Sequence, residues 1–153
     1  MQVIAFTASR TIPSPAIGRL EQTLNHLATT VENPLWVTGA CVGGDQWIAN
    51  RLTYLSPFAP QRIVVPRDRS RVDSSWLAMM ALQPNVKIIE MGRGTTYRDR
   101  NVALLDLSPG ANRLVAFPLH EEKDERSARS GSWMTVRLAR TRLIPYEAWV
   151  MEP

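Results

Sequence analysis

Residues 37–49 read VTGACVGGDQWIA, and this stretch decides the fold. An apolar run at residues 35–37 leads into it, and an apolar helical pattern follows it. Three glycines lie between the two, with Asp45 at the position where a helix would begin. A strand that turns through glycines into a helix presents unpaired N–H groups to an anion, although an ordinary tight turn uses the same pattern. The stretch therefore predicts a strand–helix unit with a candidate phosphate cradle at its turn.

The composition is that of a folded globular chain with a basic character. The 153 residues carry a formal net charge of +4, and 44% of them are hydrophobic, which is typical of a single domain with a sizeable core. Lys87 and Lys123 are the only lysines, so arginine supplies nearly all the positive charge. Arginine binds phosphates and carboxylates through two hydrogen bonds at once, which favours an anionic partner, although a genome rich in G and C would give the same bias.

The sequence also bears on the cellular compartment. Cys41 is the only cysteine, which excludes an internal disulfide and gives no sign of an oxidising environment. No apolar run approaches the ~20 residues of a membrane helix, and the N-terminus lacks a signal-peptide pattern. We therefore expect a cytoplasmic protein with no membrane partner.

Apolar runs alternate with helical patterns along the whole chain. Strands are predicted at residues 3–6, 35–37, 62–66, 86–89, 113–117 and 146–150. Between them, helices are predicted from an N-cap at Ser14 to Val31, from Asp45 to Leu55, from a cap at Asp73 or Ser74 to Leu82, from Tyr97 to Leu107 and from Trp133 to Leu143. This alternation predicts an α/β fold: a single Rossmann-like, doubly wound, mainly parallel sheet of five or six strands flanked by helices.

The unusual loops all follow predicted strands. They lie at residues 7–10, 38–45, 67–71, 92–101 and 119–135, and the highly charged part at 120–129 is expected to be a flap or a disordered excursion. Ligands of open α/β sheets bind outside the carboxyl ends of the strands, so a site is expected at this edge. Every α/β domain places loops there, however, so their location alone does not establish a site.

The residues required for two common kinds of site, a nucleotide-phosphate loop and a metal site, are absent from the sequence. The glycines at 39, 43 and 44 do not match the dinucleotide fingerprint, and no Walker lysine follows them. His26, His120 and Cys41 have no metal-ligand spacing, so we predict no metal and no cofactor other than a nucleotide-like ligand. Cys41 has no evident base beside it, which favours a small buried turn residue over a nucleophile.

Arg98 and Arg100 stand at the start of a predicted helix, where cations oppose the helix dipole. A bound anion would remove this cost. The alternative is a local ion-pair network with Asp99.

Four short motifs, in this order, resemble those of the SLOG superfamily. TASR at 7–10 resembles its T-G-S-R, and TGACVGGD at 38–45 resembles its T-G-G-x-x-G-x-D. YRDRN at 97–101 is similar to its R-N motif, and SGSWMTV at 130–136 is similar to its late G-S/G-T loop. The superfamily contains DprA-like DNA-processing proteins, the LOG nucleoside-monophosphate phosphoribohydrolases (once misnamed lysine decarboxylases) and YspA-like ligand sensors.

The resemblance spans nearly the whole chain and implies one SLOG-like Rossmann domain over residues 1–153. It further implies a nucleotide or nucleotide-derived ligand and a homodimer. Together with Arg98, the residues expected to contact the ligand or its phosphate are Ser9, Arg10, Gly39, Ala40, Gly43, Gly44, Asp45, Arg100, Asn101, Gly131, Ser132 and Thr135. The apolar residues Trp76, Met79 and Met80 would form either a dimer interface or part of the core.

The chain departs from the phosphoribohydrolases at the residue that their chemistry needs. Their motif is P-G-G-x-G-T-x-x-E, and Thr135 stands where the glutamate is expected. Threonine cannot act as a carboxylate acid or base, and nothing in the sequence positions Glu121 or Glu122 to replace it. We therefore expect a module that binds or senses a nucleotide and has no known catalytic residue. A phosphoribohydrolase is the first alternative and a DprA-like DNA-processing protein the second.

Overall fold

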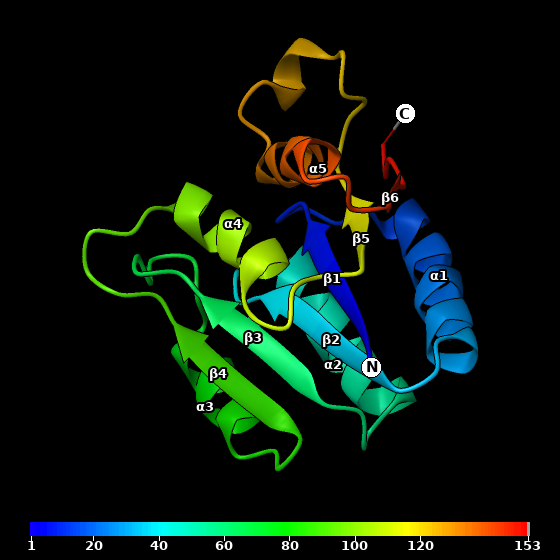
Figure 1. The fold of residues 1–153 in the computed structure, drawn as a ribbon. Helices are drawn as coiled ribbons and strands as arrows, with labels where there is room; N and C mark the ends of the chain where they lie inside the picture. The colour runs from blue at the N-terminus through cyan, green and yellow to red at the C-terminus, as the bar shows by residue number, and fades with distance from the viewer. Residues whose placement is uncertain (153) are drawn as a thin grey trace.

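The computed structural model describes residues 1–152 and contains a six-stranded sheet in which all neighbouring strands are parallel (Figure 1). The order across the sheet is β4-β3-β2-β1-β5-β6. The strands are β1 (Gln2–Ala8), β2 (Pro34–Gly39), β3 (Gln61–Val65), β4 (Val86–Glu90), β5 (Arg113–Phe117) and β6 (Tyr146–Ala148). The predicted Rossmann-like α/β fold is confirmed.

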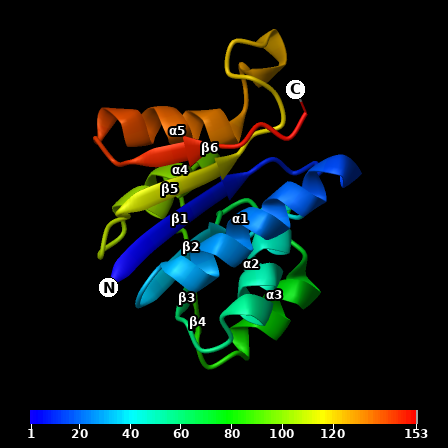
Figure 2. The same ribbon diagram turned by 90° about the vertical axis from the view of Figure 1, so that its right-hand side faces the viewer.

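Helices cover both faces of the sheet (Figure 2). One face carries α1 (Ile17–Thr30), α2 (Gly44–Leu55) and α3 (Ser74–Ala81), and the other carries α4 (Tyr97–Asp106) and α5 (Gly131–Thr141). Two short 3-10 helices, η1 (Ser14–Ala16) and η2 (Glu125–Ser127), complete the secondary structure. The sheet is therefore the middle layer of three.

The alternation of side chains along β1 explains why both faces are apolar. Val3 and Ala5 belong to the core under α4 and α5, whereas Ile4 and Phe6 belong to the core under α1 and α2. Successive residues of a strand point to opposite faces, so a strand buried on both sides needs an uninterrupted apolar run. This requirement is what made β1 recognisable in the sequence.

The strand order creates a crevice between β1 and β5. From β1 the chain steps outward through β2 and β3 to β4, and then crosses the sheet to place β5 on the other side of β1. The loops that follow β1 and β5 consequently leave in different directions, and ligands of doubly wound sheets bind at such a switch point.

One predicted detail is wrong, and a second is only partly met. Ser14 is not an N-cap: it is the first residue of η1, whose N-cap is Pro13, and α1 begins only at Ile17. Pro15 fits the tighter turn because a proline needs no N–H partner in the first turn of a helix. Residues 120–129 are also not wholly irregular, since they contain η2, in which the Asp124 side chain accepts a hydrogen bond from the Arg126 amide.

The apolar side chains of α3, expected either at a dimer interface or in the core, differ in their exposure. Trp76 and Met80 are buried in the core, while Met79 is 52% exposed.

Within residues 1–152, no helix is long and apolar enough to cross a membrane.

Gly44→Ala is expected to destabilise the protein by about 1–3 kcal/mol, because a Cβ there would lie 2.4 Å from both the Ala8 Cβ and the Ser9 carbonyl oxygen. Gly18→Ala in α1 is the matched control, since nothing lies within 4 Å of its Cβ position. The control should be neutral or stabilising by up to about 1 kcal/mol. Urea denaturation of the two variants measures both effects, and equal stabilities would contradict the packing described here.

Candidate functional site

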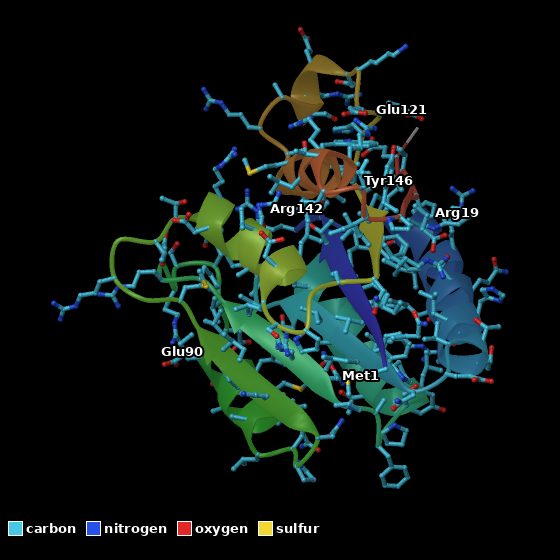
Figure 3. The ribbon with its side chains drawn as sticks, in the orientation of Figure 1. Met1, Arg19, Glu90, Glu121, Arg142 and Tyr146 are labelled. Carbon is cyan, nitrogen blue, oxygen red and sulfur yellow. The ribbon has the colours of Figure 1, made fainter. Side chains whose placement is uncertain are left out.

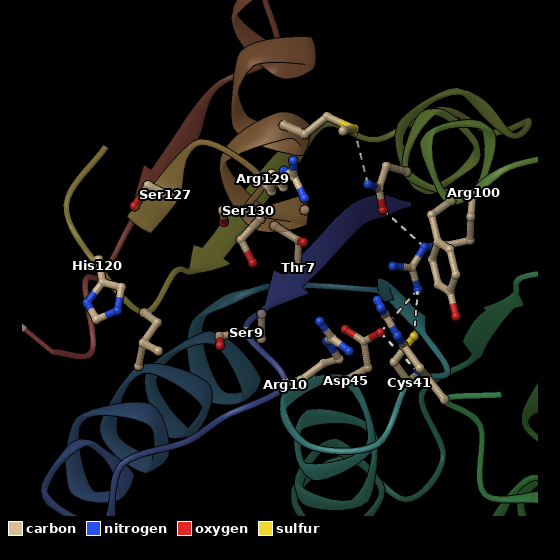
Figure 4. A pocket seen from close by; sticks show the side chains of 18 of the residues that line it. Thr7, Ser9, Arg10, Cys41, Asp45, Arg100, His120, Ser127, Arg129 and Ser130 are labelled. Carbon is tan, nitrogen blue, oxygen red and sulfur yellow. Dashed lines mark hydrogen bonds and ion pairs between the residues drawn. The ribbon is translucent and has the colours of Figure 1, made fainter. Parts of the chain in front are cut away.

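A pocket with a volume of about 470 Å³ opens at the switch point between β1 and β5 (Figure 4). The loops that follow β1, β2, β3 and β5 contribute to it, and so does helix α4, which follows β4. Its lining consists of residues 7–10, Cys41, Asp45, Arg71, Tyr97, Arg100, Asn101, Leu119, His120, Arg126, Ser127, residues 129–132 and Met134. The site edge predicted from the loops therefore does carry a pocket.

Just over half of the predicted ligand-contacting residues line this pocket. Those that do are Ser9, Arg10, Asp45, Arg100, Asn101, Gly131 and Ser132. Those that do not are Gly39, Ala40, Gly43, Gly44, Arg98 and Thr135. A place in the pocket wall does not by itself establish a ligand contact, so the binding role of both groups stays a prediction.

A buried ion pair forms the right-hand end of the pocket in Figure 4. Arg100 and Asp45 are only 8% and 6% exposed, and the Arg100 Nη1 donates to the Asp45 Oδ2 at 3.1 Å. The same oxygen accepts the backbone N–H of Cys41 at 3.2 Å. The pair joins α2 to α4, two helices on opposite faces of the sheet.

Asn101 fixes the orientation of the guanidinium. Its Oδ1 accepts from the Arg100 Nε at 3.0 Å, and its Nδ2 lies 3.6 Å from the Met134 sulfur at the start of α5. Among residues 1–152, the Arg100 Nη2 has no acceptor, and the residue lines the pocket. The guanidinium is thus held through Nε and Nη1, which leaves one nitrogen for a ligand.

The contacts of Arg100 contradict the alternative in which Arg98 and Arg100 form an ion-pair network with Asp99. Asp99 does not pair with Arg98 or Arg100 among the described residues. Its carboxylate instead accepts from the Thr96 N–H at 2.7 Å and completes a capping box at the start of α4. The expected ion-pair network with Asp99 is therefore wrong, because the buried carboxylate of Asp45 occupies Arg100 and helix capping occupies Asp99.

The glycines of the opening stretch make room for protein groups. A Cβ at Gly39 would lie 2.1 Å from the Arg100 Nη1 and 2.3 Å from the Asp45 Oδ2. Gly43 has a φ of 93°, and a Cβ there would lie 1.9 Å from the Arg10 carbonyl oxygen. Since the Gly44 N–H also donates to the Ser9 carbonyl oxygen at 3.0 Å, this turn packs against the loop after β1. The space that a side chain would need at these glycines is therefore filled by the ion pair and by that loop.

Burial has the largest effect on the pKa values of Asp45 and Cys41, the two titratable groups next to Arg100. It raises the pKa of the Asp45 carboxyl, against the opposing effects of Arg100 and the Cys41 N–H. It also raises the pKa of the Cys41 thiol, and the neighbouring Asp45 adds to this shift. Thiolates are the reactive form, so a buried thiol with a raised pKa fits the predicted role of Cys41 as a packed turn residue.

Three further arginines carry exposed, uncompensated charge at the pocket. Arg10, Arg71 and Arg129 line it and form no salt bridge within residues 1–152, whereas Arg126 is paired with Asp124. The Arg71 guanidinium lies 5.3 Å from the ring centre of Tyr97, and that of Arg100 lies 5.8 Å from the same ring. Positive charge therefore surrounds the entrance as well as the buried end.

The N-terminus of α5 forms another side of the pocket. The Ser130 side chain accepts the Trp133 N–H at 3.2 Å, and the first backbone bond of the helix runs from Met134 to Ser130. The N–H groups of Gly131 and Ser132 precede that bond and have no acceptor within residues 1–152. Such amides and the positive end of the helix dipole favour an anion.

Thr135 lies beneath this helix terminus and outside the pocket lining. It is fully buried, and its hydroxyl donates to the Gly131 carbonyl oxygen at 2.9 Å. Thr135 thus stabilises the first turn of α5.

Sequence reasoning missed several lining residues, among them His120, Arg71, Tyr97 and Arg129. Tyr97 opens a helix that was recognised, and its position about one turn before Asn101 could have suggested that both residues face the same site. His120 carries no such signal, because its place at the pocket depends on the path of the chain after β5.

Comparisons with known proteins establish the fold of this chain. No family model matches the chain, and no curated protein matches it either. A solved structure of DNA processing protein A from Helicobacter pylori, described for its single-stranded DNA binding mode, matches with a TM-score of 0.62 and 14% identity. The match covers 96% of this chain and 64% of that one, so this chain spans less than two thirds of that protein's length. The two proteins share a fold.

Asp45→Asn is expected to destabilise the protein by about 3 kcal/mol, because it leaves the Arg100 charge buried without its partner. Asp106→Asn is the matched control, since Asp106 pairs with Arg142 at the surface and such pairs contribute less than about 1 kcal/mol. Thermal and urea denaturation measure the difference. Similar losses in both variants would show that the buried pair does not act as described.

Proposed function

We propose that this chain is a SLOG-like module that binds or senses a nucleotide or a nucleotide-derived small molecule. The observation that carries the proposal is the guanidinium of Arg100. It is buried, held by Asp45 and Asn101, and keeps its Nη2 at the pocket without a partner among residues 1–152. A guanidinium fixed in this way is suited to donate to a phosphate oxygen without losing further side-chain entropy.

The charge around the pocket supports a phosphate as the group that is recognised. Arg10, Arg71 and Arg129 lie at its wall without salt-bridge partners among residues 1–152, and Asp45 is the one carboxylate of the described lining. The free amides at the start of α5 add two further donors. This combination favours a compact anion over a cationic or neutral ligand.

The size and the apolar part of the pocket support a ligand larger than inorganic phosphate. A volume of about 470 Å³ lies in the range of small-molecule sites. Leu119, Met134 and the Tyr97 ring supply apolar surface that a base can contact. The SLOG-like motifs and the shared fold with DNA processing protein A support the same class of site.

Arg129→Ala is expected to weaken the binding of a nucleoside monophosphate by about tenfold, because it removes one charge-assisted hydrogen bond to the phosphate. Arg19→Ala is the control: Arg19 is exposed on α1 (Figure 3) and does not line the pocket. Isothermal titration with AMP, GMP, CMP and UMP gives Kd. The free energy of unfolding of the wild type should also rise by about 2.7 kcal/mol at a hundredfold excess over Kd.

No binding of any of these nucleotides by the wild type, or equal Kd values for the two variants, would overturn the proposal. The same incubations analysed by chromatography test the phosphoribohydrolase alternative. Intact nucleotide is the expected result. Release of the free base would show that the chain hydrolyses the nucleotide rather than only binding it.

Single-stranded DNA is a second candidate ligand. The structurally similar DNA processing protein A is described for binding it. Further exposed arginines without salt bridges in the described residues, namely Arg67, Arg93 and Arg98, extend the positive surface beyond the pocket along the loops after β3 and β4. A polyanion contacts such a surface, whereas a mononucleotide does not reach it.

The double variant Arg67→Ala/Arg93→Ala separates the two ligands. It is expected to leave the Kd for a nucleoside monophosphate unchanged, because neither residue lines the pocket. If DNA is the ligand, the variant weakens binding of a fluorescent oligothymidine and flattens its salt dependence, by a slope of about 0.7 for each phosphate that the protein no longer neutralises. An oligothymidine that binds no more tightly than a mononucleotide would exclude DNA as the ligand.

A further inference from the structure

Thr7 is the one polar residue in the buried part of β1. Residues 3–7 of this strand are all buried, and Thr7 is 4% exposed. Since side chains alternate along a strand, Thr7 points to the same face of the sheet as Val3 and Ala5, the face that α4 and α5 cover. A valine of similar shape would fill this position without a hydroxyl to satisfy, so the threonine calls for an explanation.

The hydroxyl of Thr7 is free and accessible. Within residues 1–152 its Oγ1 has no hydrogen-bond partner, yet it is not one of the polar atoms that the protein encloses without a partner, so it keeps accessible surface. Thr7 lines the pocket, and its backbone is fixed in the sheet beside Ala116 of β5. The accessible surface of this nearly buried side chain therefore opens into the pocket.

Most other hydroxyls of the pocket wall already bond to the protein. The side-chain oxygens of Ser9 and Ser130 each accept a backbone N–H. The hydroxyls of Ser127 and Tyr97 each donate to a backbone carbonyl oxygen. The Ser132 hydroxyl has no such bond within residues 1–152, but it stands next to the free amides at the start of α5, where the proposed phosphate contacts lie.

Thr7 lies between the two ends of the pocket. Figure 4 shows it with Arg100 on one side and His120 on the other. In a nucleoside monophosphate, the sugar joins the phosphate to the base. A nucleotide whose phosphate accepts from Arg100 would therefore bring its sugar to the middle of the pocket, where Thr7 lies.

We propose that the Thr7 hydroxyl forms a hydrogen bond with a ribose hydroxyl of the bound nucleotide. The inference rests on the proposed nucleotide-binding function and deepens it, because it names the part of the ligand that the middle of the pocket recognises. An ionised phosphate oxygen only accepts hydrogen bonds, whereas a ribose hydroxyl both donates and accepts, as the threonine hydroxyl does. Arg100 and the free amides of α5 supply donors for the phosphate, which leaves Thr7 for the sugar.

A comparison of two ligands tests this role on the unsubstituted protein. One is the nucleoside monophosphate that binds most tightly, and the other is its dideoxy analogue, which lacks both ribose hydroxyls. We expect the analogue to bind about tenfold more weakly, because the Thr7 hydroxyl then loses its partner. Isothermal titration gives both Kd values, and this measurement does not depend on the folding of any variant.

Two variants then assign the preference to Thr7. Thr7→Val keeps the shape of the side chain without its hydroxyl, and we expect it to weaken the binding of the ribonucleotide by about tenfold. Its Kd values for the dideoxy analogue and for pyrophosphate should equal those of the wild type. Thr7→Ser retains the hydroxyl and should keep most of the ribonucleotide affinity. Thr29→Val is the matched control, since Thr29 is exposed on α1 and does not line the pocket.

The outcomes separate the two proposals. Three results would each overturn the role of Thr7 and leave the proposed function intact: equal binding of the ribonucleotide and its dideoxy analogue by the wild type, ribonucleotide binding that Thr7→Val leaves unchanged, or an equal loss for pyrophosphate. The last result is the one that a merely structural role would give. Failure of the wild type to bind any nucleotide would overturn the proposed function and this inference with it.

Discussion

The ion pair between Arg100 and Asp45 is the constraint on which the site depends. It lies over the end of β2 and connects helices from the two faces of the sheet, so it fixes how α2 and α4 meet at the carboxyl edge. Gly39 has no side chain because the pair occupies that space. A buried pair of this kind seldom adds net stability over apolar packing, since both charges lose their hydration. Its presence here fits the proposed function, in which the guanidinium of Arg100 is held in place for a ligand.

The sequence was sufficient for the fold because the physics that builds it is local. Each strand buried on both faces appears as a short apolar run, and each amphipathic helix shows one apolar stripe. The alternation of the two then leaves few arrangements of the sheet. The edge that carries the pocket followed from the same argument, since parallel strands end on one side.

The partners within the site could not be inferred in the same way. Arg100 stands next to Asp99 in sequence, yet it pairs with Asp45, 55 positions away, because the crossing of α4 over the sheet brings the two together. The glycines at 43 and 44 also make room for the backbone after β1, a contact that the motif did not predict. His120 gave no pattern at all. Each of these depends on contacts between distant segments, which neither periodicity nor a short motif encodes.

The path of the chain after β5 divides the pocket into two parts with different origins in the sequence. The side that holds Arg100 is assembled from separate segments that pack into the core, so a change in one disturbs the others. The opposite side, from Leu119 to Met134, comes from one continuous segment that includes His120, Arg129 and the start of α5. Under the proposed function, substitutions or length changes within that segment would alter ligand preference while the buried guanidinium stays in place.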